Sequence, residues 1–399
     1  MTLLAISTPF ILFLSAAGVV QAMLLASILF FHPKADRTVT RFLSLHILTV
    51  SIFMLMPVSQ YFFSWQSITL LIPFQFLIGP ALYLYVRSFK ETINGRKAWP
   101  HFLLFALLLI LDTQIYIVWM RKYPSSENMP KELLLEPISY IHIIIRNVQM
   151  LFYYFLARRS LRSYQNSIRH LYSETSRISL EWVRWLVNGF LLLIITIFIL
   201  FFFVFKFPER FSLLILLNTL IITPYIYIVT LKGISQPTLW QMQPGKDKEE
   251  IEKEIVNAAV VDSSTNEKKG QSFIRGLTED KATELTSRIL LLMEKDKLYL
   301  DPELTLQALS DKLGTQAYQV SQAINEGLKK NFYDLVNNYR VQEAKRLLLH
   351  PKNVNYTVLS IGFEAGFNSK TTFNTVFKKF TGMTPTEYKE RQKEIHSPA

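Results

Sequence analysis

The sequence contains no cysteine, and this absence excludes several kinds of site. Without thiols the chain cannot form disulfides, use a thiolate nucleophile or bind zinc through cysteine. The absence does not fix a compartment, because cytoplasmic chains also lack cysteine. Enzyme signatures are missing too: there is no Walker loop, no zinc-protease motif, no nucleophile elbow and no kinase signature. We therefore expect a protein that is not an enzyme and has no cofactor or metal site.

Charge is scarce over long stretches of the chain. Residues 42–86 contain no Asp, Glu, Lys or Arg, and only 19% of all 399 residues are charged, whereas 50% are hydrophobic. The mean hydropathy is +0.21, which is unusual for a soluble protein. The 43 Lys and Arg exceed the 31 Asp and Glu, giving a net charge of +12. Such an excess favours an anionic partner, either lipid headgroups or nucleic acid.

The first 232 residues form a series of apolar runs, each long enough to cross a bilayer as a helix. A span takes about 20 apolar residues, so the uncharged stretch 42–86 is too long for one. The polar residues 64–66 are where we place the turn inside it. The predicted spans are residues 8–31, 42–63, 67–86, 101–120, 137–156, 183–205 and 211–231.

The short loops predict the orientation of these seven spans, because cytoplasmic loops are rich in Lys and Arg. Loops one, three and five carry most of the basic residues. The opposite side holds only Arg121, Lys122, Lys131, Lys206 and Arg210. We therefore expect the N-terminus outside and everything after residue 231 in the cytoplasm. No Lys or Arg precedes the first run, which we interpret as a retained span and not as a cleaved signal peptide.

The polar remainder divides into a linker and a C-terminal domain. Residues 233–300 are predicted to be a cytoplasmic linker with helical pieces, including a charged segment at 246–259 and a flexible one at 262–271. Residues 278–297 repeat apolar side chains at helical spacing. This helix either transmits a signal, pairs two chains or packs on the neighbouring domain, and we favour packing. The domain itself covers residues 301–392, and residues 393–399 are a tail.

One motif occurs twice in the C-terminal domain. In each copy an apolar helical face contains a small residue, Ser310 or Gly362, and a glycine follows four residues later, Gly314 or Gly366. Two helices that cross closely need a small side chain at the contact, and glycine adopts the positive φ of the turn without steric cost. This is the logic of a helix-turn-helix. A long amphipathic helix, 332–350, joins the two copies.

At these residues the sequence resembles the DNA-binding domain of AraC/XylS-type regulators. The resemblance covers residues 301–391, about a quarter of the chain. It is carried by the run Ile361-Gly362-Phe363-Glu364-Ala365-Gly366-Phe367-Asn368-Ser369-Lys370, by Phe380-Thr381-Gly382-Met383-Thr384-Pro385, and by Asn338-Tyr339-Arg340. Gly362 stands where the family usually has Ala, and Gln316 where it has a Ser cap. Thr315 is the alternative cap.

The resemblance implies which residues face DNA. In a helix-turn-helix the start of the second helix contacts base edges, whereas other groups hold phosphates. Arg340 and Lys379 are phosphate contacts or scaffold charges. The expected DNA-binding residues are Tyr318, Ser321 and Gln322 in the first copy, and Lys370, Thr371, Asn374, Thr375 and the phosphate contact Lys378 in the second.

Ionisable residues inside predicted spans indicate a candidate intramembrane polar site. Asp112 and Arg146 lie in consecutive spans at similar distances from the loop between them, and His142 is nearby. They form either a ligand pocket or an interhelical clasp between Asp112 and Arg146. We favour the clasp.

Taken together, the sequence predicts an all-α protein: a polytopic seven-helix membrane domain followed by a cytoplasmic domain with two helix-turn-helix motifs. The expected function is a membrane-anchored, sequence-specific transcription regulator in the cytoplasmic membrane. Double-stranded DNA and membrane lipid are the expected partners, and RNA polymerase and a second copy of the chain are candidates. The alternatives are a transporter with an attached regulatory domain and a receptor whose tail binds protein.

Overall fold

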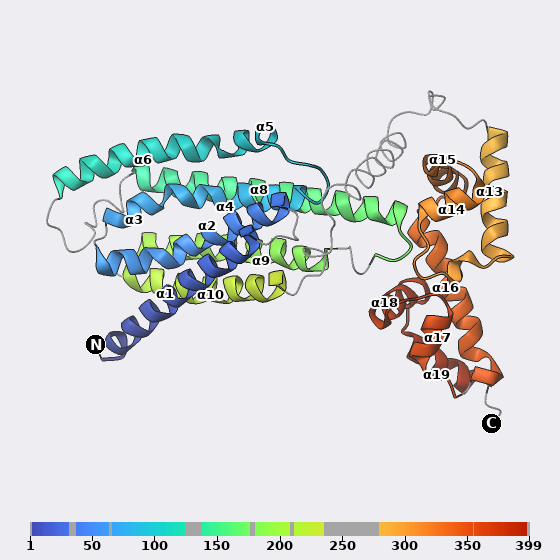
Figure 1. Ribbon diagram of the computed structural model, residues 1–399. Helices are drawn as coiled ribbons and strands as arrows, with labels where there is room; N and C mark the ends of the chain where they lie inside the picture. The colour runs from blue at the N-terminus through green and yellow to red at the C-terminus, as the bar shows by residue number, and fades with distance from the viewer. Residues whose placement is uncertain are drawn as a thin grey trace. The chain divides into compact units, whose positions relative to one another are not determined.

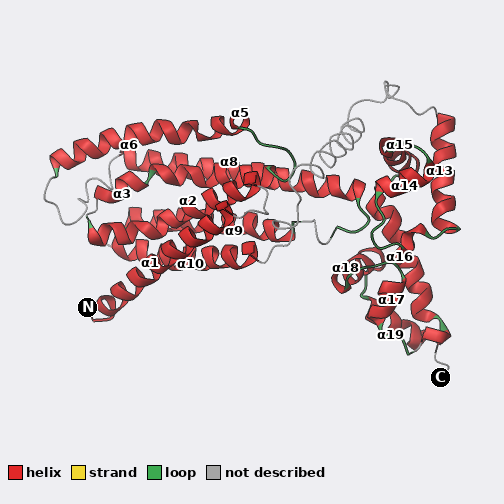
Figure 2. Cartoon of the chain, in the orientation of Figure 1, coloured by secondary structure: helices red, strands yellow, loops and turns green. Residues whose placement is uncertain are grey.

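The structure, a computed structural model, is helical in the parts of the chain that it describes (Figures 1 and 2). One isolated antiparallel bridge, between Tyr172 and Thr305, is the exception to helices and loops there. The all-α prediction is therefore confirmed. The chain forms two compact units, Met1–Tyr164 with Leu180–Lys248, and Gln165–Ser179 with Glu249–Ala399. The described residues are 2–31, 37–63, 66–123, 137–175, 180–207, 211–234, 279–353 and 355–396.

The first unit is a bundle of long apolar helices. Its elements are α1 (Thr2–Phe31), α2 (Arg37–Phe62), α3 (Gln66–Leu71), η1 (Pro73–Leu77), α4 (Ile78–Arg87), α5 (Gly95–Ala98), η2 (Trp99–Phe102), α6 (Leu103–Lys122), α8 (Pro137–Leu171), α9 (Glu181–Lys206) and α10 (Phe211–Ile234). α8 crosses the boundary between the units, because its residues up to Tyr164 belong to the first and those from Gln165 to the second.

The third predicted span is not one continuous helix. It is divided into α3, a 3₁₀ segment η1, and α4. Pro73 lacks the N–H that an α-helix would need there, which explains the break after α3. The fully buried Gln75 lies in this 3₁₀ segment. The break therefore places a polar side chain inside the bundle.

Among the residues that the structure describes, four helices are long and apolar enough to cross a membrane. They contain Leu12–Phe31, Arg37–Phe62, Gly95–Lys122 and Glu181–Leu200, and α10 contributes a shorter apolar stretch, Leu217–Val229. The seven-span count stays a prediction. The remaining predicted spans are helical but fall outside these four.

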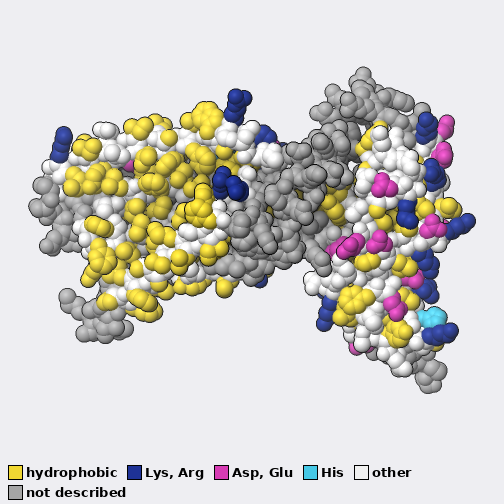
Figure 3. Space-filling model, in the orientation of Figure 1, with side chains coloured by type: hydrophobic (Ala, Val, Ile, Leu, Met, Phe, Trp, Pro, Cys, Tyr) yellow, Lys and Arg dark blue, Asp and Glu magenta, His cyan; other side chains and the backbone are white. Residues whose placement is uncertain are grey.

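The first unit exposes large apolar side chains along its helices. Phe31 is 77% exposed and Phe155 is 63% exposed. Figure 3 shows hydrophobic side chains covering much of the visible face of this helical bundle. A water-soluble surface rarely carries continuous apolar patches larger than a few hundred Å², so this surface fits contact with lipid. In the second unit, the exposed large apolar residues among those described are Leu291, Leu349, Tyr356 and Phe363.

The second unit contains the C-terminal helices. These are α13 (Glu279–Glu294), η4 (Leu298–Leu300), α14 (Leu306–Leu313), α15 (Ala317–Gln322), η5 (Ala323–Gly327, a π-helical turn), α16 (Phe332–Leu349), η6 (Pro351–Asn353), α17 (Val358–Glu364), α18 (Lys370–Thr381) and α19 (Pro385–His396). The linker segments expected at 246–259 and 262–271 lie outside the described residues.

The second unit has two hydrophobic cores that share α16. Leu335 and Val336, near the start of α16, belong to the first core, and Ala344 and Leu348, near its end, belong to the second. α13 packs Leu285, Ile289 and Met293 into the first core, as we favoured. Leu171 at the end of α8 is also part of the first core, which explains why residues 165–179 group with the C-terminal unit.

Candidate nucleic-acid interface

The first helix-turn-helix consists of α14 and α15. Thr305 caps α14, since its hydroxyl accepts a hydrogen bond from the N–H of Ala308 at 3.1 Å. Ser310 is fully buried and donates to the Leu306 carbonyl at 2.7 Å, as expected for a small residue at a close helix crossing. Gly314 ends α14 with a φ of +65°. The prediction that Thr315 caps α15 is wrong, because Gln316 occupies the cap position and its side chain makes no cap hydrogen bond.

The second helix-turn-helix consists of α17 and α18, and its crossing is tighter. A Cβ on Gly362 would lie 2.5 Å from the Phe373 ring of α18. A Cβ on Gly366, which has a φ of +90°, would lie 2.4 Å from the Tyr299 carbonyl oxygen. Ser369 caps α18 by accepting from the N–H of Thr372 at 3.1 Å. Both glycines therefore permit contacts that a larger residue would block.

The expected contact residues of the second motif share the outer face of α18. Lys370, Thr371, Thr375 and Lys378 are exposed, and Asn374 is half-buried. The opposite face carries Thr372, Phe373, Val376 and Phe377, which are buried. The helix therefore presents amide, hydroxyl and ammonium groups outward, the groups that bond base edges and phosphates.

The first motif offers fewer free groups than the sequence indicated. Ser321 is only 4% exposed, and Asn325 Nδ2 lies 3.4 Å from its hydroxyl oxygen. Tyr318 and Gln322 are half-buried. The Gln322 amide donates to the Glu326 carboxylate at 3.2 Å and 3.3 Å, so a base contact would have to displace that bond. Ser321 thus lies in the packing of the motif, not on its outer face.

Two basic residues that had been candidates for phosphate contacts or scaffold charges have partners within the second unit. Lys379 forms an ion pair with Asp334 at 2.5 Å, and its ammonium lies over the Tyr333 ring. The Arg340 side chain is fully buried, and its Nε donates to the Tyr299 carbonyl at 2.7 Å. Burial lowers the pKa of Arg340 to about 10, which still leaves the guanidinium protonated at neutral pH. Lys378 and Lys379 are both exposed on α18, and Lys379 is the one with an ion-pair partner.

A segment far away in the sequence also contacts Arg340. Its Nη2 donates to the Ser173 hydroxyl at 3.1 Å and to the Asp301 carbonyl at 2.7 Å, while Nη1 donates to the Ser173 carbonyl at 3.3 Å. Asn337 Nδ2 donates to the same Ser173 carbonyl at 2.9 Å. Sequence reasoning missed this site, because a main-chain acceptor leaves no mark in the pattern of side chains.

The polar residues of the first unit form pairs other than the expected clasp. Asp112 forms its pair with His142, at 3.0 Å between Oδ1 and Nε2. Arg146 instead donates from Nη1 to the Gln75 side chain and lies over the Phe53 ring. The expected Asp112–Arg146 pair is thus replaced by two separate contacts. Gln75 lies in η1 and accepts from Arg146, a contact that the positions of the charged residues along the spans did not predict.

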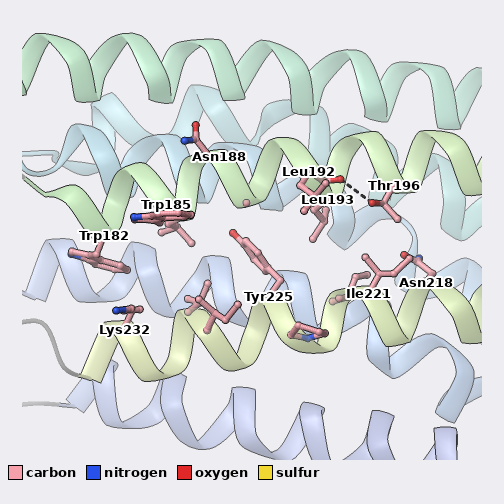
Figure 4. A pocket seen from close by; sticks show the side chains of 16 residues that line it. Trp182, Trp185, Asn188, Leu192, Leu193, Thr196, Asn218, Ile221, Tyr225 and Lys232 are labelled. Atoms are coloured by element: carbon pink, nitrogen blue, oxygen red, sulfur yellow. Dashed lines mark hydrogen bonds between the residues drawn. The ribbon is translucent and has the colours of Figure 1, made fainter.

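A second candidate site in the first unit is a pocket between α9 and α10 (Figure 4). It has a volume of about 410 Å³, and its walls are mostly apolar. Trp182 and Trp185 of α9 point toward α10 at the end where Lys232 lies, and Asn218 lies toward the other end. Tyr225 also lines the pocket, and its hydroxyl bonds to His46 Nε2 at 2.9 Å.

The comparisons with known proteins agree with the geometry of the second unit. A family described as a helix-turn-helix domain matches residues 309–391. Similar curated proteins include uncharacterized HTH-type transcriptional regulators of Staphylococcus aureus strains COL, MSSA476 and N315. Each is 28% identical over 113 residues, which are 28% of this chain but only 14% of the relative. No solved structure matches the chain.

The match begins within α14 and ends within α19, so it includes both pairs of crossing helices and α16 between them. The capped helix α18, the turn glycines and the shared helix α16 all lie inside it. The C-terminal part of this chain is a helix-turn-helix domain of the AraC type.

Proposed function

We propose that the protein is a membrane-anchored transcription regulator that binds specific DNA sequences through α15 and α18. The observation that carries the proposal is the outer face of α18, where Lys370, Thr371, Asn374, Thr375 and Lys378 lie together on a helix with a capped start. Such a helix start placed in a major groove brings its first residues to base edges. Double-stranded DNA is the proposed partner, with RNA polymerase and a second copy of the chain as further candidates.

The membrane anchor is supported by the four long apolar helices and by the exposed apolar surface of the first unit. We propose that the N-terminus is outside and that the C-terminal unit lies in the cytoplasm, where DNA is accessible. A reporter fused after residue 231 should then behave as cytoplasmic and one inserted in residues 123–131 as external. Finding both reporters on one side would contradict this topology.

Base reading is tested by comparing two variants of α18. Asn374→Ala removes a side chain that can bond adenine bidentately, so it should cost about 1–3 kcal/mol on the preferred site and relax the base preference there. Lys378→Ala removes an exposed charge, so it should weaken binding to all sequences alike and flatten the salt dependence. The measurement is binding of the purified chain to a library of duplexes at several salt concentrations. Identical behaviour of the two variants would refute the assignment.

We further propose that the membrane unit passes an external or membrane signal to the DNA-binding unit. α8 supports this, because one helix supplies residues to both compact units. Mapping the chromosomal sites that the chain occupies would identify the regulated genes and so suggest the signal.

A further inference from the structure

The segment Tyr172–Glu174, directly after α8, contacts both halves of the DNA-binding unit. In the first half, Tyr172 forms a bridge with Thr305, and the Ser173 hydroxyl donates to the Leu304 carbonyl at 2.6 Å. In the second half, the Thr372 hydroxyl of α18 donates to the Glu174 carboxylate at 3.2 Å. Three consecutive residues thus link the start of α14 to the reading helix α18.

The middle of this segment is held by α16, the helix that both cores share. Ser173 is fully buried, and its carbonyl accepts from Asn337 and Arg340 of α16. Without Ser173, the buried Asn337 and Arg340 would each lose a hydrogen-bond acceptor, and unsatisfied buried donors are costly. The segment is therefore an integral part of the unit and does not merely lie on its surface.

Two reading helices can occupy one DNA site only if their separation matches the DNA. Successive major grooves on one side of a duplex lie about 34–36 Å apart. A link from α14 to α18 across α16 restrains this separation, because it adds hydrogen bonds to the packing of α16 in both cores. The contact between Glu174 and Thr372 involves the buried face of α18, so it leaves the outer face of that helix open.

We propose that Tyr172–Glu174 is an in-chain clamp that holds the two helix-turn-helix motifs in the orientation needed to bind a complete DNA site. The proposal rests on the proposed DNA-binding function. Because the clamp follows α8 directly, a displacement of α8 acts on both motifs together.

The test uses the full chain in lipid nanodiscs and a duplex selected from a random library by that chain. Glu174→Ala removes the acceptor for Thr372, whereas Glu174→Gln keeps an acceptor oxygen and is the matched control. We expect Glu174→Ala to weaken binding to the complete site about fivefold to tenfold and to leave binding to either half-site unchanged. Glu174→Gln should bind the complete site and the half-sites with the affinities of the native chain.

The outcomes separate the clamp from the function on which it rests. Equal affinity of Glu174→Ala and the native chain for the complete site would overturn the clamp while leaving DNA binding intact. An equal loss on complete and half-sites would also overturn it, because a clamp acts only when both motifs bind. If the native chain selects no sequence from the library, the proposed function itself fails.

Docking of the clamp is tested independently by cross-linking, for which the cysteine-free sequence is well suited. Tyr172 and Thr305 are opposite each other in an antiparallel bridge. Such pairs have Cα atoms about 4.5–5.5 Å apart, within the range for a disulfide. Tyr172→Cys with Thr305→Cys should therefore cross-link on mild oxidation. The control Tyr172→Cys with Gln307→Cys should not, and equal cross-linking of both pairs would show that the segment is not docked.

The pocket between α9 and α10 carries a second, independent inference. Trp182 is 8% exposed, and its buried indole N–H has no hydrogen-bond partner in the structure. Among the described lining residues, Lys232 has the one formal charge, and Figure 4 shows it beside Trp182. The Lys232 ammonium can donate hydrogen bonds to an anion, whereas the rest of the wall is mostly apolar. Ligand pockets are typically about 300–1,000 Å³, so 410 Å³ is large enough for one small ligand.

We infer that this pocket binds a single-chain amphiphile with an anionic head, with the chain along α9 and α10 and the head at Lys232. The probes are 9,10-dibromostearate, whose bromines quench tryptophan, and its uncharged methyl ester. In detergent, the acid should quench the full chain saturably. Lys232→Glu should weaken binding of the acid about tenfold and leave binding of the ester unchanged. Ile221→Trp should fill the cavity and so prevent saturable quenching of the other tryptophans. Non-saturable quenching would refute the site, and equal effects of Lys232→Glu on acid and ester would refute the head-group assignment.

Discussion

Replacing Gly366 by Ala tests whether the turn of the second motif is fixed by packing as well as by backbone conformation. Its φ of +90° is unfavourable for any residue with a Cβ, at about 1–2 kcal/mol. The new Cβ would also lie 2.4 Å from the Tyr299 carbonyl oxygen and 2.9 Å from Leu300 Cα. Tyr299 cannot move away easily, because its carbonyl accepts from Arg340. Overpacking of this kind costs about 1–3 kcal/mol, so the total is about 2–5 kcal/mol.

Two other glycines provide matched controls. Gly314 has a φ of +65° and Gly382 a φ of +82°, and a Cβ at either position meets no atom within 4 Å. Gly314→Ala and Gly382→Ala should therefore cost only the conformational part, about 1–2 kcal/mol. The comparison isolates the packing contribution, since all three variants introduce the same methyl group.

The assay is pulse proteolysis of the full chain in detergent across a urea gradient, with the C-terminal unit followed through a C-terminal tag. A slope of about 1–3 kcal/mol per M urea is typical for small domains, so Gly366→Ala should unfold on the order of 1 M urea below the two controls. If Gly366→Ala and Gly314→Ala have the same midpoint, the close approach to Tyr299 does not stabilise the fold and the reasoning is refuted.

Two further predictions concern other parts of the chain. Asp112→Asn and His142→Gln should each lower protein abundance, and the double variant should partly recover it, because the two residues form a pair. The losses from Asp112→Asn and Arg146→Gln should instead be additive, because Asp112 and Arg146 have different partners. Quantitative immunoblotting measures the abundance of each variant, and coupling of Asp112 to Arg146 would contradict the structure. Hydrogen bonds from the N–H and side chain of Thr384 lower the pKa of Glu387. This capping contact therefore stabilises α19 above the ordinary carboxyl pKa of about 4.3 and is lost as pH falls through the lowered pKa. Glu387→Gln should remove that part of the acid dependence of the urea midpoint, and an unchanged pH profile would rule the contact out.

Local patterns in the sequence determined much of this protein. Apolar runs longer than a soluble helix needs predicted helices in the N-terminal half, because only the helix satisfies the backbone within an apolar environment. Both helix-turn-helix motifs were predicted from residues a few positions apart, since a turn glycine such as Gly366 and a cap such as Ser369 act on their own backbone. The residues expected on the outer face of α18 followed from their positions in the motif that resembles AraC/XylS-type regulators.

Contacts between distant segments were decided only by the tertiary structure. Asp112 pairs with His142, which lies one helical turn from the expected partner Arg146, and spacing along a span cannot distinguish the two. Ser321 was expected to face DNA but is buried, because the helical pattern around it does not show what packs against it. The clamp has no clear sequence signature, since Ser173 makes part of its contacts through its backbone N–H and carbonyl, which nearly every residue has. Which carbonyl fills the donors of Arg340 depends on where the chain after α8 lies, and only folding decides that.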